Sequence, residues 1–532
     1  MTFDRAAMAV LAAAALAVAL TFRDYGISWD EPVQNTYGIL TLNYYLSLGR
    51  DRSSFDFVNL FWYGALFDTL AAAANRILPF AEYDTRHLLG GIAGLVGLAA
   101  AWRLARTLGG PRAGFIAVLL LAVTPVWYGN TFINPKDIPF AAAMTWAAYF
   151  TVRIAQSLPA WRWGDFIGAG VASGAAMGTR VGGVIALLYL GAMLAMHGGL
   201  SLLDREKLGD LVRRLVRLIP PTLGATAAAL GVMYLCWPWA QHAPIARPLE
   251  ALANFSRFPI TLDYPFYGRI VTSTNAPWYY EPGLMAAMLP ELTLAALAVA
   301  LVLGLAALAG AARTDWQRCL PLAVLALLVL FPPVYVAADR AVLFDGMRHL
   351  LFVVPPLTVA AALAIDVLWR RGRIAGVIAM VLLGATTIHQ ATLLWRAHPY
   401  QYLVFNALVG GVAGAAGKFE LDYWGTAFRE AVAGMAAALP PPAPGRPWRV
   451  MVCGPEASAQ LFFPPGFEPV ARQRVVEADI IISNTRYQCP RGAYQDAARP
   501  LVVVRRFDTP LAYVYDVRGH RSLTYAPYPP TP

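Results

Sequence analysis

Long apolar runs are the feature that most limits what this chain can fold into. They recur between residues 6 and 392, and their length of about 17 to 25 residues is enough for a helix to cross the hydrocarbon core of a bilayer. Only 14% of the 532 residues are charged, whereas soluble domains carry roughly 25%. The sequence therefore predicts an all-α polytopic membrane protein instead of a set of soluble domains.

About 11 of these runs are long enough to be membrane spans. The stretch 57–80 is partly apolar, but Asp68, Asn75 and Arg76 interrupt it, so we predict that it lies at the membrane surface. The first run follows Arg5 and has no small-residue cleavage site after it, which favours a retained span over a signal peptide. The predicted spans are residues 6–22, 87–107, 113–131, 139–155, 164–179, 182–198, 218–236, 283–310, 317–335, 349–368 and 374–392.

Basic residues are unevenly shared between the loops. Lys and Arg collect in every second loop, and cytoplasmic loops carry such an excess, so we expect the N-terminus in the cytoplasm. The formal net charge of +10 is not gathered into one patch with interleaved aromatic residues, so membrane lipids are expected partners and nucleic acid is not. The segments expected on the outer face are 23–86, 132–138, 237–282, 336–348 and everything after residue 392.

The last part of the chain has a different character. A proline-rich stretch from Pro440 to Pro447 is typical of a linker, and a segment of helical periodicity, 422–439, precedes it. Short β-rich runs follow it and predict a small α/β domain. Cys453 and Cys489 lie in that domain and could pair in an oxidising compartment. The expected parts are a membrane module at 1–425, a helix and linker at 426–447 and an α/β domain at 448–532, with strands near 450–453, 480–482, 501–504 and 512–515.

Two adjacent carboxylates, Asp30 and Glu31, follow the first span in the segment Ser28-Trp29-Asp30-Glu31-Pro32. Near an apolar wall, burial raises the pKa of a carboxyl group unless a cation or a metal compensates. Such a carboxylate can act as a general base toward an acceptor hydroxyl. Alternatively, Asp30 caps the next helix, with Pro32 in its first turn. The spacing leaves both interpretations open.

A second polar motif, Asn134-Pro135-Lys136-Asp137-Ile138-Pro139, fills a short loop between two spans. Lys136 and Asp137 together could hold a phosphate and orient a substrate or a metal. The alternative is a turn in which the prolines break the helices and Asp137 caps the next one. The predicted topology favours a functional role, because this loop is expected on the same face as Asp30.

Two arginines stand at outward span ends, against the trend of the positive-inside rule. Arg180 follows Gly178-Thr179, and Arg348 precedes His349 at the start of a late span. A guanidinium binds phosphate oxygens in pairs, so a lipid-linked phosphate is one explanation. Pairing with nearby aspartates is the other. His349 alone is typical of an interfacial polar residue, and its place beside Arg348 makes it a candidate substrate contact.

Aromatic residues are frequent in the loop 237–282 and predict an interfacial belt. Part of this belt could stack on a sugar or guide a lipid chain. The candidates for substrate contact there are Trp278 and Tyr279.

Taken in order along the chain, these segments resemble the membrane glycosyltransferases of the GT-C fold. The resemblance is to the family 39 branch, which includes protein O-mannosyltransferases and the aminoarabinose transferases of lipid A, and it covers roughly residues 1–425. The motifs that carry it are Asp30-Glu31, the basic turn 103–112, the loop 134–137, the segment 345–349 and the runs 402–406, 410–411 and 422–425.

The resemblance implies a sugar donor on a polyprenyl phosphate and an acceptor in the cell envelope, which could be a lipid, a polysaccharide or a protein. It implies transfer with inversion on the periplasmic face of the bacterial inner membrane. Asp30 corresponds to the base, with Glu31 beside it, and Asp137 to the second acidic residue. Lys136, Arg180 and Arg348 would stabilise the departing phosphate.

Two points of the resemblance bear on the substrates. Not all relatives require a divalent metal, so Mg²⁺ or Mn²⁺ is an open expectation, with Asp30, Glu31 and Asp137 as the ligands if one binds. Relatives that act on lipid A carry a Lys-Pro-Pro segment near the end of the first loop. Here Trp62-Tyr63-Gly64 stands in that place, which makes Tyr63 a candidate substrate contact and argues against lipid A as the acceptor.

Three other functions would use the same residues. A transporter or lipid flippase should carry ionisable groups near the middle of the membrane, whereas most of them here stand at span ends. A non-catalytic scaffold of an envelope assembly complex would use the C-terminal domain for docking and would tolerate the loss of Asp30. A ligase or polymerase would differ in taking a diphosphate donor.

Overall fold

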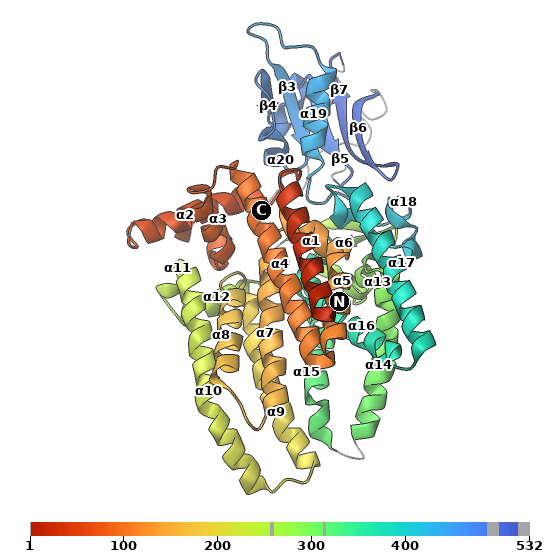
Figure 1. The fold of residues 1–532 in the computed structure, drawn as a ribbon. Coiled ribbons are helices and arrows are strands. Elements are labelled where there is room, and N and C mark those ends of the chain that lie inside the picture. The colour runs from red at the N-terminus through yellow and green to blue at the C-terminus, as the bar shows by residue number, and fades with distance from the viewer. Residues whose placement is uncertain (1, 256–259, 312–314, 487–498, 520–532) are drawn as a thin grey trace.

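A bundle of long helices carries a small sheet at one of its ends (Figure 1). The computed structural model describes residues 2–255, 260–311, 315–486 and 499–519. The predicted fold class is confirmed, because the membrane part is helical and the strands of the larger sheet all lie after residue 447.

Within the described ranges, nine helices are long and apolar enough to cross a membrane. α7 and α16 are the most enclosed of them, whereas α1, α14 and α17 expose most of their surface, as expected of helices that face lipid. The 3-10 turns η3 (Val181–Gly183), η5 (Trp316–Cys319) and η6 (Gly346–Val353) lengthen α9, α15 and α16 at their start. The nine are α1 (Phe3–Thr21), α4 (Glu82–Gly109), α7 (Asp137–Ser157), α9 (Val184–Leu203), α10 (Leu208–Cys236), α14 (Glu291–Ala311), α15 (Leu320–Asp339), α16 (Val354–Trp369) and α17 (Arg373–Ala397).

Three predicted spans differ from straight membrane helices. The run 113–131 forms α5 (Pro111–Ala122) and α6 (Pro125–Ile133), which meet at an angle of 62°, because Pro125 cannot continue a helix that precedes it. The run 164–179 forms α8 (Trp163–Met177), whose 15 residues are fewer than the roughly 20 that a span needs. The run 283–310 is divided near Pro290 between α13 (Tyr280–Met288) and α14. The described residues thus give nine spans, or ten with the bent pair, and do not confirm a count of eleven.

The first large loop contains short elements only. α2 (Glu31–Leu46) lies across the bundle near the end that carries the sheet (Figure 1), and α3 (Leu66–Asn75) packs against it. The stretch 57–80 thus contains η2 (Leu60–Trp62) and the ten-residue α3, as expected of a segment that does not span. η1 (Ser53–Phe55) completes the loop.

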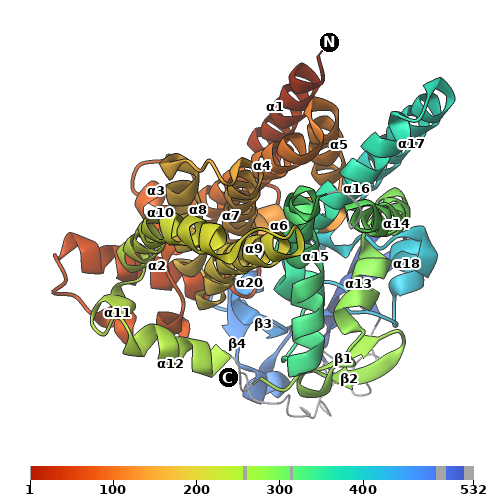
Figure 2. The ribbon, with the colours of Figure 1, turned by 90° about the horizontal axis from the view of Figure 1, so that it is seen from below.

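The loop 237–282 contains α11 (Pro238–Gln241), α12 (Ala246–Phe255), η4 (Ser273–Asn275) and a hairpin of β1 (Asp263–Phe266) and β2 (Arg269–Thr272). Viewed from below, α8 and α10 lie on one side of the bundle, and α14 and α17 lie on the other (Figure 2). After α17 the chain forms η7 (Gln401–Leu403), η8 (Ala407–Val409) and α18 (Gly411–Ala415).

The C-terminal sheet has five strands in the order β4-β3-β5-β7-β6. β3 runs parallel to β4 and β5, whereas β7 is antiparallel to β5 and β6, and α19 (Phe428–Ala438) packs on the sheet. Four strands lie where the β-rich runs predicted them. The short strand β4 was not expected, because Pro469 interrupts its run. It can still form, since β4 lies at an edge of the sheet, where proline is tolerated. The strands are β3 (Trp448–Cys453), β4 (Phe467–Val470), β5 (Ile480–Asn484), β6 (Pro500–Arg506) and β7 (Thr509–Asp516), with α20 (Glu456–Gln460) after β3 and η9 (Arg472–Glu477) after β4.

The predicted pairing of Cys453 with Cys489 stays a prediction. Cys453 ends β3 and is buried. Cys489 lies outside the described residues.

Candidate functional site

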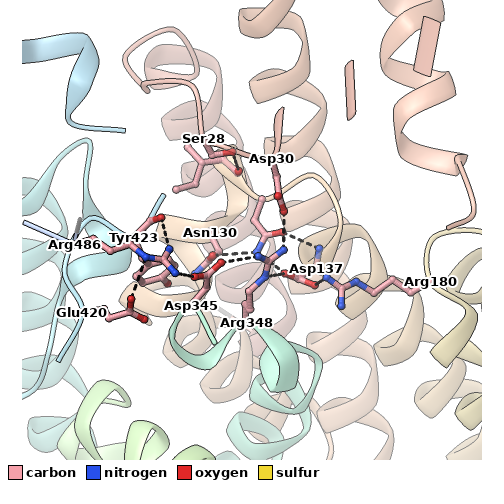
Figure 3. A network of polar contacts seen from close by, with 12 residues as sticks. Ser28, Asp30, Asn130, Asp137, Arg180, Asp345, Arg348, Glu420, Tyr423 and Arg486 are labelled. Atoms are coloured by element: carbon pink, nitrogen blue, oxygen red, sulfur yellow. Dashed lines mark hydrogen bonds and ion pairs between the residues drawn. The ribbon is translucent and has the colours of Figure 1, made fainter. Parts of the chain in front are cut away.

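Arg348 lies among three aspartates at the end of the bundle nearest the sheet (Figure 3). Its Nη2 is 2.8 Å from Asp30 Oδ2, its Nε is 3.1 Å from Asp137 Oδ2 and its Nη1 is 3.0 Å from Asp345 Oδ2. The three aspartates come from the first loop, the start of α7 and the turn before η6. Sequence segments more than 300 residues apart therefore meet at one guanidinium.

The turn before η6 determines where Arg348 points. Asp345 and Gly346 both have left-handed backbone angles, with φ of 61° and 67°, and they reverse the chain immediately before the 3-10 turn. Gly346 is required there, because a Cβ would lie 3.1 Å from the Tyr423 hydroxyl in addition to the strained angle. The Trp424 ring then covers the Arg348 guanidinium at 4.4 Å, an attractive contact between a cation and an aromatic face.

Asp137 is held from three directions. Asn134 Nδ2 donates to Asp137 Oδ2 at 2.8 Å, and the Asp137 backbone N–H donates to Asn134 Oδ1 at 2.9 Å. Arg180 forms an ion pair with the other carboxylate oxygen. Asp137 is the first residue of α7 and does not use its side chain as a helix cap, so the capping alternative does not describe this carboxylate.

The acidic pair after the first span is divided between two environments. Asp30 precedes α2 and makes no side-chain cap bond; its carboxylate faces Arg348. Glu31 points elsewhere, because its Oε2 accepts a hydrogen bond of 2.7 Å from the Ser28 backbone N–H and its Oε1 lies 3.1 Å from His87 Nε2. Glu31 therefore stabilises the loop before α2, while Asp30 is the member of the pair that lies among the cations.

Lys136 supplies a further cation at the same place. Its Nζ lies 4.1 Å from the centre of the Tyr63 ring, and it forms no ion pair with any residue that the structure describes. Burial lowers the pKa of Lys136 to about 8, the Asp30 carboxylate opposes this shift and the Arg180 guanidinium adds to it. The N–H donors of this ammonium remain available to an anionic ligand.

Asp30 is ionised in this setting. Burial alone would raise its pKa, but the Arg348 guanidinium and the Lys136 ammonium outweigh burial, so the net pKa of Asp30 lies below its ordinary value. An ionised carboxylate can accept a proton, which a base requires.

Of the other predicted substrate contacts, Tyr63 lies at the site, whereas Trp278 and Tyr279 do not. His349 lies beside Arg348, but its ring packs edge-on against Phe344 at 4.9 Å, and its buried Nε2 has no hydrogen-bond partner among the described residues. Trp278 and Tyr279 are exposed by 71% and 44% and pack on each other. The structure does not bring these two aromatic residues to Arg348.

The network continues beyond the residues that the sequence indicated. Asp345 Oδ1 forms an ion pair of 2.6 Å with Arg486 Nη2, and Arg486 Nε lies 3.1 Å from Glu420 Oε1. Glu420 and Arg486 were missed because their contacts depend on the folded chain. The only available signal was that Glu420 stands close to the run 422–425. We call the series Arg180, Asp137, Arg348, Asp345, Arg486 and Glu420, with Asp30 attached to Arg348, the ion-pair chain.

The three predicted metal ligands do not form a common site in this arrangement. The Asp30 and Asp137 carboxylates face arginines, and Glu31 faces His87. No group of three His, Cys, Asp or Glu residues in the described part of the chain is placed to hold a metal.

Comparisons with known proteins agree with this architecture. The family model described as dolichyl-phosphate-mannose-protein mannosyltransferase matches residues 70–237, which include Lys136, Asp137 and Arg180. The crystal structure of ArnT from Cupriavidus metallidurans bound to undecaprenyl phosphate has 15% sequence identity and a TM-score of 0.50, and the similarity covers 97% of this chain and 99% of ArnT. No curated protein matches the chain significantly.

A second solved structure is similar over a smaller part of its length. It is the archaeal oligosaccharyltransferase AglB from Archaeoglobus fulgidus in complex with an inhibitory peptide and a dolichol-phosphate, with 13% identity, a TM-score of 0.47 and coverage of 90% of this chain and 69% of AglB. The family match over residues 70–237 and the ArnT-like fold both agree with the predicted resemblance. The chain thus has several helices able to cross a membrane and shares the fold of ArnT.

Proposed function

We propose that this chain transfers a sugar from a polyprenyl-phosphate donor to a hydroxyl of an envelope acceptor, with inversion and with Asp30 as the base. The observation that carries the proposal is the meeting of one ionised carboxylate with Lys136, Arg180 and Arg348 at one end of the helical bundle. The ArnT structure that shares this fold was obtained with undecaprenyl phosphate, which supports a donor of that kind.

The cations suit the donor phosphate. A lipid carrier keeps the donor in the bilayer while its phosphate and sugar reach the span ends, so the phosphate must be bound there. Lys136 has free N–H donors, and Arg348 and Arg180 present guanidinium groups that match phosphate oxygens. Cations that are already in place stabilise the negative charge that gathers on the departing phosphate.

Asp30 acts on the other side of the reaction. It removes the proton from the acceptor hydroxyl, the acceptor oxygen bonds to the anomeric carbon, and the bond between that carbon and the phosphate oxygen breaks. One displacement inverts the anomeric carbon and needs no covalent intermediate with the protein. Phosphate binding gives Arg348 a further anionic partner beside its three aspartates, which weakens its hold on Asp30 and makes Asp30 a stronger base.

The remaining acids hold this arrangement in place. Asp137 keeps two arginines at fixed positions, and Glu31 fixes the loop that presents Asp30. We place the site on the periplasmic face of the bacterial inner membrane, because it shares the end of the bundle with the segments that the charge pattern puts outside.

The test is sugar release from a panel of labelled polyprenyl-phosphate monosaccharides by purified protein in liposomes with crude envelope acceptors. The variant that tests the base is Asp30→Asn. Its matched control is Asp24→Asn, because Asp24 is an exposed acid of the same loop that pairs with His398. We expect the wild type and the control to consume one donor equally. Movement of an intact labelled lipid across the bilayer without sugar release would instead support a flippase.

A further inference from the structure

Arg486 belongs to the C-terminal sheet region but contacts the membrane module. It follows β5 by two residues, and its Nη2 forms an ion pair of 2.6 Å with Asp345 Oδ1. Its Nε pairs with Glu420 at 3.1 Å, and its Nη1 donates to the Tyr423 carbonyl at 2.9 Å. The side chain is 5% exposed. Figure 3 shows this arginine at the end of the ion-pair chain opposite to Arg180.

Asp345 connects Arg486 to the candidate site. Its carboxylate is fully buried, with Oδ1 toward Arg486 and Oδ2 toward Arg348 Nη1 at 3.0 Å. A buried carboxylate between two guanidinium groups has its orientation determined by both, because each oxygen is held by one cation. Loss of either arginine leaves the other to attract both oxygens.

Arg348 has three hydrogen-bonding directions, and each is used by a different aspartate. If Asp345 turns and engages Arg348 through both oxygens, the guanidinium must shift away from Asp30 or Asp137, because its donors have a fixed planar geometry. The orientation of Arg348 toward Asp30 thus depends on a residue of the C-terminal sheet region.

We propose that Arg486 is a positioning residue through which the C-terminal domain sets the orientation of Arg348. The C-terminal domain then contributes to the candidate site, because the arginine proposed to bind phosphate is aligned only when this domain is docked. For its effect on turnover the inference rests on the proposed function. The predicted orientation of Arg348 does not depend on the proposed function.

A second arginine of the same sheet offers a matched control. Arg506, at the end of β6, pairs with Glu430 at 2.8 Å and donates to the His398 carbonyl at 3.1 Å. It therefore also ties the sheet to neighbouring segments of the chain, but it has no contact with Asp345 or Glu420 in the described structure. A loss of lipid affinity that occurs in the Arg486 variants but not in the Arg506 variant therefore reflects the ion-pair chain and not domain docking in general.

The experiment compares Arg486→Gln, Arg486→Lys and Arg506→Gln in the full chain, with undecaprenyl phosphate as the probe and its affinity read by native mass spectrometry. We expect Arg486→Gln to weaken binding by about tenfold or more, because a buried partner is removed. Arg486→Lys should fall between it and the wild type, since an ammonium keeps the charge but cannot hold Asp345 and Glu420 together in one plane. Arg506→Gln should bind like the wild type.

Asp345→Asn decides whether Arg486 acts through Asp345. In a protein that already carries Asp345→Asn, Arg486→Gln should cause no further loss of affinity for undecaprenyl phosphate. If the double variant instead loses affinity by the product of the two single losses, the proposal is overturned. Wild-type affinity in Arg486→Lys and Arg486→Gln would overturn it as well. A wild type that binds undecaprenyl phosphate but consumes no donor would refute the proposed transfer, and the affinity comparison would still decide the role of Arg486.

Discussion

Arg348 has one positive charge and three acidic neighbours, so the balance of the site depends on the cations around it. Lys136 and Arg180 offset two of those negative charges, and Arg486 pairs with Asp345 from the far side. Side chains of one sign would repel each other here, whereas charges of alternating sign attract each other. Under the proposed function, we expect an incoming phosphate to exchange with these carboxylates instead of entering an uncompensated cavity.

The pKa of Lys136 gives a pH dependence at the residue scale. Burial lowers this pKa to about 8, so the ammonium is charged below pH 8 and becomes neutral as the pH rises through that value. We expect the KM for the donor to rise above pH 8, because one phosphate-binding cation is lost. Lys136→Arg should move this rise to higher pH, since an arginine stays charged.

The profile of KM against pH, measured by donor consumption in both proteins, is the test. An identical rise in the wild type and in Lys136→Arg would show that another group titrates.

At the residue scale, the sequence predicted most of the residues of the candidate site but not where their side chains point. Asp30, Lys136, Asp137, Arg180 and Arg348 all lie together, because loop residues at one end of a bundle must converge. The spacing could not show that Glu31 turns toward His87 and Ser28, since adjacent residues at a helix start point in different directions. Nor could it place Trp278 and Tyr279, whose distance from the site depends on how the hairpin β1–β2 folds.

At the scale of elements, proline and helix length account for the differences from the predicted spans. Thr124-Pro125 was visible in the sequence, yet the apolar run continued through it, and only the structure shows that α6 leaves α5 at 62°. This bend directs the chain toward Asn134 and the start of α7, where Asp137 is held. A straight span would have placed the loop 134–137 elsewhere.

The short helix α3 is attached to α4 by a buried ion pair. Arg86 Nη2 lies 2.6 Å from Asp68 Oδ1, and the side chains are 0% and 6% exposed. Asp68→Asn leaves a buried guanidinium without its counter-charge, which costs about 3 to 5 kcal/mol of unfolding free energy in comparable pairs. We expect a loss of that order in detergent denaturation.

The matched control for this prediction is Asp4→Asn. Asp4 forms an ion pair of 2.8 Å with Arg106, but the side chains are 36% and 41% exposed, so its loss should cost about 1 kcal/mol or less. Equal losses in the two variants would contradict the account of α3.

At the scale of the whole molecule, the charge of the loops and the position of the sheet point to the same outer face. The sheet was predictable from its β-rich runs, and its strand order was not, because β-rich runs do not reveal which strands pair. Its contact with the site through Arg486 was equally hidden. The link joins residues 345 and 486, and no local pattern marks such a pair.

The predicted topology can be tested by labelling. Arg52 and Arg371 are both exposed, and we expect them on opposite sides of the membrane, with Arg52 outside. Arg52→Cys should react with a membrane-impermeant maleimide in spheroplasts, and Arg371→Cys should react only after lysis. The reverse pattern would invert the topology and place the site in the cytoplasm.

The central claim is that Asp30 is the base and that the cations bind the donor phosphate without its help. The most direct measurement compares wild type with Asp30→Asn for two quantities in the same preparation, which are the affinity for undecaprenyl phosphate and the rate of sugar release from the donor. We predict that Asp30→Asn binds the lipid at least as tightly as the wild type, since a competing negative charge is removed from Arg348, and that it releases no sugar. Release at the wild-type rate by a folded Asp30→Asn protein would contradict the account.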